Sequence, residues 1–202
     1  MRSRLRIPKL GGPGHRLGYG EIPLTACYEW IGRPAPELGL RAQAEWYARD
    51  CLLVHAFHFH RINSALLYDV SNSYYHSPWG TTGLLSRYPA LVPRPSYVAL
   101  ATVTQVLDGA RVVGSVPTGS LSLFAMEFVS SQGRTYALWT PRGTRQVTFR
   151  FAGDTELAMI DLWGRERRMA TRGAAVEFSA GTAPVFVRSP LAVRSIAAGA
   201  WS

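Results

Sequence analysis

Glu29 is the carboxylate whose position most suggests chemistry. It stands near the end of a short apolar run, EIPLTACYEW (21–30), between the aromatic residues Tyr28 and Trp30. A carboxylate at the end of a buried strand can act as a nucleophile or as a general acid or base, and the flanking rings offer flat stacking surfaces. The alternative is that Glu29 only opens the following loop, paired with Arg33.

A second group of aromatic and polar residues follows a later apolar run, INSALLYDV (62–70). The chain then enters a loop (71–95) that is long enough to be functional. Tyr68 and Trp79 are the candidates for binding a ligand in this region. A loop that only packs against the rest of the fold is the alternative.

Other kinds of site lack their signatures. His55, His58 and His60 lie close together, and the first two can share a helical face. A zinc site needs a convincing third ligand and carboxylate partners, which nothing nearby supplies, so we expect histidines on or near a packed helix end. The glycines of GGPG (11–14) are not followed by the Lys-Ser/Thr pair of a phosphate-binding loop. Cys27 and Cys51 read as small buried hydrophobic residues. The sequence therefore predicts no metal and no cofactor.

The elements around Glu29 follow a strand–helix–strand order. The run 21–30 predicts a buried strand, and a helix is expected from Glu37 because apolar residues recur at three- and four-residue steps. These are Leu40, Ala44, Tyr47, Cys51 and Val54. The run 62–70 predicts a second buried strand, so the unit is a βαβ with parallel strands.

The character of the sequence changes after Gly109. Pro95 and Gly109 bracket a predicted helix, and short β-type runs separated by Gly, Pro, Ser or Asp follow it. Alternation in QVTFRFA places Val147, Phe149 and Phe151 on one face of a strand. The pattern predicts an antiparallel β-sandwich.

Four segments result from this division. Residues 1–20 are expected to be a flexible N-terminal segment and 21–110 the βα segment. Residues 111–190 are expected to form the sandwich and 191–202 a C-terminal tail.

Composition excludes several classes of protein. The formal net charge is +9, with Lys9 as the only lysine, and the arginines are scattered rather than gathered with aromatics. This distribution argues against a nucleic-acid partner. No apolar run is long enough for a membrane helix and no secretory signal opens the chain, so a cytoplasmic protein is expected for the sequence as written.

Three segments together resemble the C-terminal portion of a retaining (β/α)8-barrel glycoside hydrolase of the large clan with two catalytic glutamates. PRPSYVALATVTQVLDGARVVGSV (93–116) looks like the last barrel helix entering the first strand of a β-sandwich. ELAMIDLWGRERRM (156–169) and GTAPVFVR (181–188) resemble later parts of that sandwich. The resemblance covers roughly residues 21–190 and implies an α/β plus all-β chain, a partial barrel of two βα units followed by the sandwich.

The resemblance also implies roles for the residues. Glu29 takes the place of the nucleophile at the end of the seventh barrel strand, and Tyr28, Trp30, Tyr68 and Trp79 take substrate-binding places. In an alternative alignment, Trp30 matches the last residue of the family's Thr-Glu-aromatic-Gly-Trp run, and Cys27 occupies the glutamate's position. The acid/base glutamate belongs to the fourth strand, which these residues do not supply.

Two functions therefore stay open. The first is a fragment of a glycosidase acting on a β-linked glycan, inactive alone, with a carbohydrate substrate in the parent family. The second is a non-catalytic carbohydrate-binding or scaffold module, with Trp139 or Trp163 as the sugar-binding aromatics. Two βα units leave strand edges and helix faces uncovered, so self-association or a complementing chain is expected.

Overall fold

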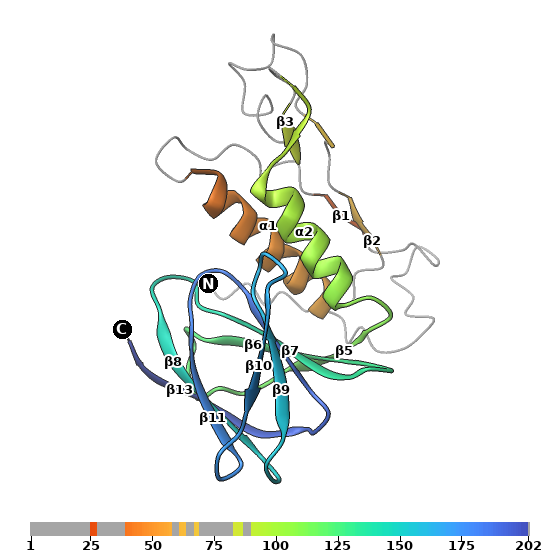
Figure 1. The fold of residues 1–202 in the computed structure, drawn as a ribbon. Coiled ribbons are helices and arrows are strands. Elements are labelled where there is room, and N and C mark those ends of the chain that lie inside the picture. The colour runs from red at the N-terminus through yellow and green to blue at the C-terminus, as the bar shows by residue number, and fades with distance from the viewer. Residues whose placement is uncertain are drawn as a thin grey trace, which may run out of the picture.

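The computed structural model describes residues 39–57, 67–68, 83–86 and 90–201, together with the backbone of residues 25–27 and 61–63. A helix pair and short strands form the first half of the chain, and an antiparallel β-sandwich forms the second (Figure 1). The candidate residues Glu29, Tyr28, Trp30 and Trp79 lie outside the described residues.

The first half contains the strand–helix–strand unit that the sequence predicts. Strand β1 (Thr25–Cys27) and strand β2 (Arg61–Asn63) pair in parallel, and helix α1 (Gly39–Ala56) connects them. Two short strands, β3 (Leu85–Ser86) and β4 (Val92–Pro93), pair antiparallel before the second helix.

Helix α2 (Pro95–Val106) begins at the expected proline and ends shortly before the expected glycine. Proline stands in its first turn, where the missing N–H costs nothing. The chain leaves the helix after Leu107, and Gly109 then adopts a positive φ of 63°. Because a side chain disfavours that conformation, a glycine suits the turn into the sandwich.

The sandwich consists of a six-stranded and a three-stranded sheet. The larger sheet has the order β10-β9-β12-β7-β6-β5, with every neighbouring pair antiparallel. Its strands are β5 (Arg111–Ser115), β6 (Phe124–Ser130), β7 (Gly133–Trp139), β9 (Glu156–Ile160), β10 (Glu166–Ala170) and β12 (Val185–Ser189). The smaller sheet has the order β11-β8-β13, from β8 (Arg145–Phe151), β11 (Ala175–Ala180) and β13 (Val193–Trp201).

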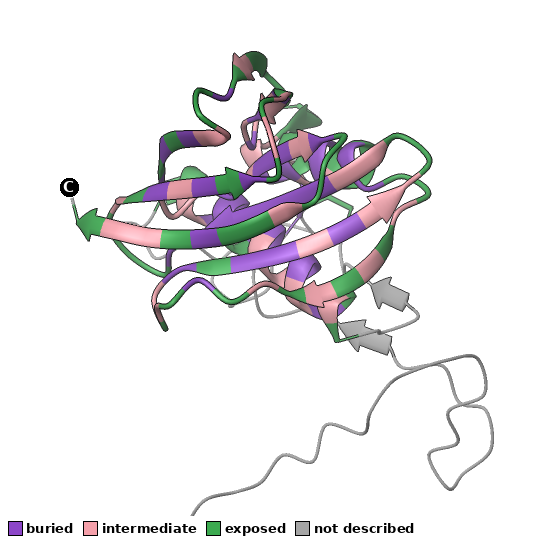
Figure 2. Ribbon diagram, turned by 90° about the horizontal axis from the view of Figure 1, so that it is seen from below, coloured by how far each residue is buried: buried purple, intermediate pink, exposed green. Residues whose placement is uncertain are grey.

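The larger sheet is the middle layer of the molecule, because its central strands are buried on both faces. Along β7, Ala137 and Trp139 face the helix pair, whereas Tyr136 and Leu138 face the smaller sheet. Buried and exposed residues alternate along other strands of the sandwich (Figure 2). Two cores therefore stabilise the chain: one between the helices and the larger sheet, and one between the two sheets.

The β9–β10 turn joins the helix pair to the sandwich. Asp161 Oδ1 accepts the backbone N–H groups of Trp163 and Arg165, which fixes the turn. Leu162 is fully buried in the core beneath the helices, and the guanidinium of Arg41 on α1 lies over the ring of Trp163. The turn thus contributes apolar side chains to the same core as α1 and α2.

One segment differs from its expectation. Residues 191–202 are expected to be a C-terminal tail, but Val193–Trp201 form β13, which pairs with β8. The strand is ordered by this pairing and by Ile196, whose side chain is buried between the sheets. No helix among the described residues is long and apolar enough to cross a membrane.

Candidate functional site

The carboxyl ends of β1 and β2 form the edge at which the sequence predicts the site. The register pairs Thr25 with Arg61 and Cys27 with Asn63, so both strands end side by side. Active sites of parallel α/β folds are built from the loops that leave this edge. Glu29 follows the end of β1 by two residues in the sequence and lies outside the described residues.

Tyr68 is the one predicted site residue whose side chain is described. It lies five residues beyond β2 and forms an isolated parallel bridge with Leu85. The backbone N–H of Leu85 donates to the carbonyl of Leu67 at 2.9 Å, which holds the segment against β3. Tyr68 is exposed, with 48% of the residue's surface accessible.

The segment that carries this bridge is tied to the start of α2. The backbone N–H of Arg94 donates to the carbonyl of Leu84 at 2.9 Å, and Nη1 of Arg94 donates to the carbonyl of Gly83 at 3.0 Å. Ser86 Oγ donates to the carbonyl of Ala90 at 2.9 Å. These bonds connect the neighbourhood of Tyr68 to the helix pair and, through it, to the sandwich.

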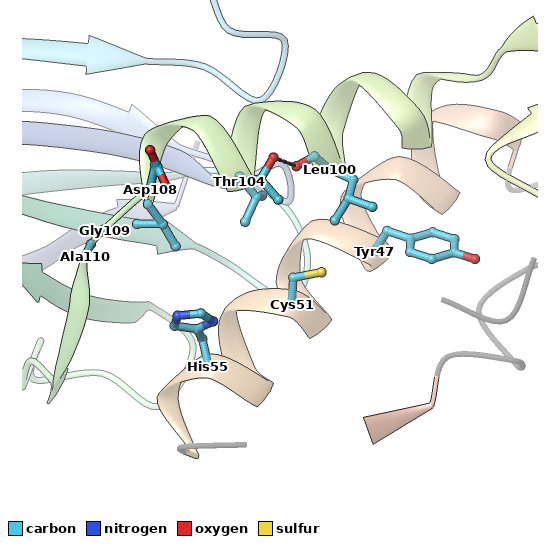
Figure 3. Close-up of a pocket in the computed structure, with 10 residues that line it drawn as sticks. Tyr47, Cys51, His55, Leu100, Thr104, Asp108, Gly109 and Ala110 are labelled. Carbon is cyan, nitrogen blue, oxygen red and sulfur yellow. Dashed lines mark hydrogen bonds between the residues drawn. The ribbon is translucent and has the colours of Figure 1, made fainter. Parts of the chain in front are cut away.

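A cavity of about 510 Å³ lies between the C-terminal halves of α1 and α2 (Figure 3). Its lining is mainly apolar, with a few polar groups near the helix ends. The lining residues are Tyr47, Cys51, His55, Leu100, Val103, Thr104, Leu107, Asp108, Gly109 and Ala110. The hydroxyl of Thr104 donates within its own helix, to the carbonyls of Leu100 and Ala101.

This cavity is not part of the edge where β1 and β2 end. Because α1 leads back from the end of β1 to the start of β2, its C-terminal end lies at the opposite edge of the strand pair. The ring of His55 lies 6.1 Å from that of Phe128 on the larger sheet, which places the cavity next to the sandwich. Among the described residues, no group of three His, Cys, Asp or Glu side chains is arranged to hold a metal ion.

Helix α1 also carries ionisable groups whose environment alters their pKa values. Burial raises the pKa of Asp50 to about 6. Burial lowers the pKa of Arg49, partly offset by the charge of Glu45. Glu45 is itself buried and accepts Nε of Arg41 at 3.2 Å. Such perturbation occurs at functional sites and in structural ion pairs alike.

Two residues that line the cavity were predicted from the sequence to be packed core residues. Tyr47 and Cys51 belong to the apolar face predicted for α1, where they were expected to be packed. The pattern contained no signal for a cavity, because its size depends on the spacing of two helices. The perturbed pKa of Asp50 likewise depends on burial that a lone acidic residue does not reveal.

No family model matches the chain, and no curated protein sequence matches it. Solved structures with the same fold do exist. One is a family 39 glycoside hydrolase from the gut symbiont Bacteroides cellulosilyticus, which is 17% identical over 86% of this chain with a TM-score of 0.66. Another is a GH30 endoxylanase from Clostridium papyrosolvens, 8% identical over 83% of the chain with a TM-score of 0.54.

The chain spans 35% and 42% of the lengths of these two proteins. At such low identity the likeness concerns the fold alone. The order of elements, βα units followed by a sandwich, agrees with the C-terminal part of such a protein. The chain therefore has the fold of a part of a glycoside hydrolase, an α/β segment continued by an antiparallel β-sandwich.

Proposed function

We propose that this chain is the C-terminal part of a retaining (β/α)8-barrel glycoside hydrolase that acts on a β-linked glycan. The fold likeness to two glycoside hydrolases over more than four-fifths of the chain is the observation that carries the proposal. In it, β1–α1 and β2–α2 are the last two barrel units, and the sandwich supports them from the side.

In this proposal Glu29 is the nucleophile. In the sequence Glu29 follows β1 by two residues and Tyr68 follows β2 by five, and the two strands end side by side. Tyr28, Trp30, Tyr68 and Trp79 then bind the sugar rings around the bond that is cleaved. Cys27 remains the competing position for the nucleophile, because it pairs with Asn63 at the very end of β1.

The 202 residues alone are expected to be inactive. Retaining hydrolysis needs a second carboxyl group about 5 Å from the nucleophile, and the cleft needs all eight units. Two units supply neither, so a complementing chain or further residues of a longer protein would provide them. Purified chain should hydrolyse aryl β-glycosides no faster than the buffer blank; turnover that Glu29→Ala removes would contradict this.

A chimaera tests the role of Glu29 directly. Residues 21–202 replace the corresponding part of the family 39 enzyme, and the product is assayed on aryl β-glycosides. Glu29→Gln should lower kcat by about 10³-fold or more, whereas Glu177→Gln, on the sandwich, should leave it unchanged. If Glu29→Gln keeps activity and Cys27→Glu raises it, the nucleophile belongs at Cys27 and our assignment is wrong.

The scaffold half of the alternative function is supported by a specific observation. Trp139 is buried (2% exposed) and stacks on Phe124 at 5.3 Å, and Trp163 packs against the helix–sheet core. Both rings therefore serve packing rather than an open sugar-binding face. If the sandwich acts only as a support, titration calorimetry should detect no binding of neutral glycans to it.

A further inference from the structure

A charged hollow lies on the helix-facing side of the six-stranded sheet, beyond the helix–sheet core. Its volume is about 290 Å³, and its walls come from β9, β10, β12 and the turn between β6 and β7. The lining residues are Gln132, Glu156, Leu157, Ala158, Glu166, Arg168, Arg188, Ser189 and Pro190.

The strand register places two arginines on either side of a small residue. Arg168 on β10 and Arg188 on β12 both pair with Ala158 on β9. Directly paired residues of antiparallel strands project to the same face, and strands two apart are about 10 Å distant. Two guanidinium groups thus border one space whose floor is a methyl group.

Neither arginine has a partner within the described part of the chain. No hydrogen bond or ion pair there involves the side chain of Arg168 or Arg188, although Arg188 is half-buried. By contrast, Arg134 on β7 and Arg165 in the β9–β10 turn each bind a carboxylate. A partly desolvated guanidinium without a partner is costly, which applies to Arg188, and the exposed Arg168 offers a second donor on the same face; together they suit an external anion.

The two glutamates of the hollow flank the arginines on the same face of the sheet, each in a residue pair two positions along the strands from the pair of Arg168 and Ala158. Glu166 pairs with Ile160 and Glu156 pairs with Ala170, and neither forms an ion pair among the described residues. Free carboxylates repel a compact anion, but they accept hydrogen bonds from hydroxyl groups. The amide of Gln132 adds a donor and an acceptor.

We propose that this hollow binds an acidic sugar residue, with its carboxylate between Arg168 and Arg188 and its hydroxyl groups on Glu156, Glu166 and Gln132. The volume, near the lower limit of about 300 Å³ for small-ligand sites, accommodates one sugar unit. The choice of a saccharide rests on the proposed function, whereas the pairing of a carboxylate with two arginines does not. The site lies on the sandwich, on residues that belong to neither β1 nor β2.

Titration calorimetry at low salt tests the proposal with the full chain. The probes are digalacturonic acid, its neutral counterpart digalactose, and inorganic phosphate. Digalacturonic acid should bind, with an affinity that falls as salt rises, and the other two should bind at least about tenfold more weakly. Because the readout is binding, the result is independent of hydrolysis in the chimaera.

Variants of adjacent arginines supply the matched control. Arg168→Ala and Arg188→Ala should each weaken binding of digalacturonic acid about tenfold or more. Arg167→Ala should not, because Arg167 lies on the other face of β10, beside the sulfur atoms of Met159 and Met169. Arg168 is exposed on an edge strand, so its removal leaves the fold intact even if Arg188→Ala does not.

Three results would overturn the proposal. One is the absence of heat with digalacturonic acid, and the second is equal binding of the neutral sugar or of phosphate. The third is unchanged affinity in Arg168→Ala.

Discussion

The hydroxyl of Tyr136 donates a hydrogen bond to Oε1 of Glu127 over 3.1 Å. The same hydroxyl accepts the backbone N–H of Val193 at 2.9 Å, and Arg134 forms an ion pair with the same carboxylate. Because Val193 belongs to β13 and the other residues to β6 and β7, the hydroxyl links the two sheets of the sandwich. Burial raises the pKa of the Tyr136 phenol, which keeps it protonated and able to donate.

Tyr136→Phe should therefore lower the free energy of unfolding by about 1–2 kcal/mol, because it leaves the N–H of Val193 without its acceptor. Urea denaturation followed by circular dichroism measures the change. Tyr97→Phe is the matched control: Tyr97 is exposed on α2, so the stability should stay within about 0.5 kcal/mol of the wild type. Equal stability of Tyr136→Phe and wild type would contradict the role of the link.

The strands of the sandwich differ in how well the sequence predicts them. In β8 the apolar residues Val147, Phe149 and Phe151 alternate with polar ones, and all three are buried between the sheets. In β13 the pairing with β8 shifts register twice, and Ile196 is its only buried residue. Strand prediction depends on apolar residues that recur at every second position, and bulges interrupt this period. The sequence of β13 therefore predicts a tail instead of a strand.

The two cavities could not be predicted for a different reason. Arg168 and Arg188 are twenty positions apart, and they become neighbours because β9 lies between β10 and β12 in the sheet. That order is a property of the folded topology. By contrast, the parallel pairing of β1 and β2 could be predicted. Two apolar runs separated by a helical pattern indicate a βαβ unit, and such a unit has parallel strands.

Asp50 should make stability depend on pH. Its pKa of about 6 in the folded chain lies above the ordinary value of 3.8, so folding favours the neutral form. The contribution is complete below about pH 4 and is lost as the pH rises through 6. A shift of two units corresponds to about 3 kcal/mol, but the group is only half-buried, so about 1 kcal/mol is expected after solvent screening.

Asp50→Asn removes this titration. The variant should be about 1 kcal/mol more stable than the wild type at pH 7 and should lose the difference near pH 4. Urea titrations at several pH values measure this, with Asp108→Asn, at an exposed position after α2, as a control for the loss of an acidic group elsewhere. A constant difference between Asp50→Asn and the wild type across this range would show that Asp50 titrates normally.

The two cores should respond separately to cavity-forming substitutions. Leu162 is buried between the helix pair and the larger sheet, and Leu157 is buried between the two sheets. Either Leu→Ala change should cost about 2–5 kcal/mol. Hydrogen exchange should then increase selectively in α1 and α2 for Leu162→Ala, and in the smaller sheet for Leu157→Ala. Identical exchange patterns would mean that the chain has one cooperative core.

Arg145 closes one end of the space between the two sheets. Its Nη1 donates to the hydroxyls of Ser120 and Ser122 at 2.7 and 2.8 Å. Its Nε and Nη2 donate to the carbonyl of Gly199 at 3.1 and 2.7 Å. The guanidinium also lies over the ring of Trp201, 4.7 Å from its centroid. One planar group thus holds the end of β13 against the loop between β5 and β6.

Lysine cannot reproduce this planar arrangement of donors, although it keeps the charge. Arg145→Lys should therefore lower the free energy of unfolding by about 1–2 kcal/mol and speed hydrogen exchange at the end of β13. The control is Arg150→Lys, on the outer face of the same strand, where the side chain is exposed and stability should change by less than about 0.5 kcal/mol. If both variants behave alike, the charge of Arg145 rather than its geometry stabilises this end of the sandwich. In that case the stacking of Trp201 would contribute nothing measurable.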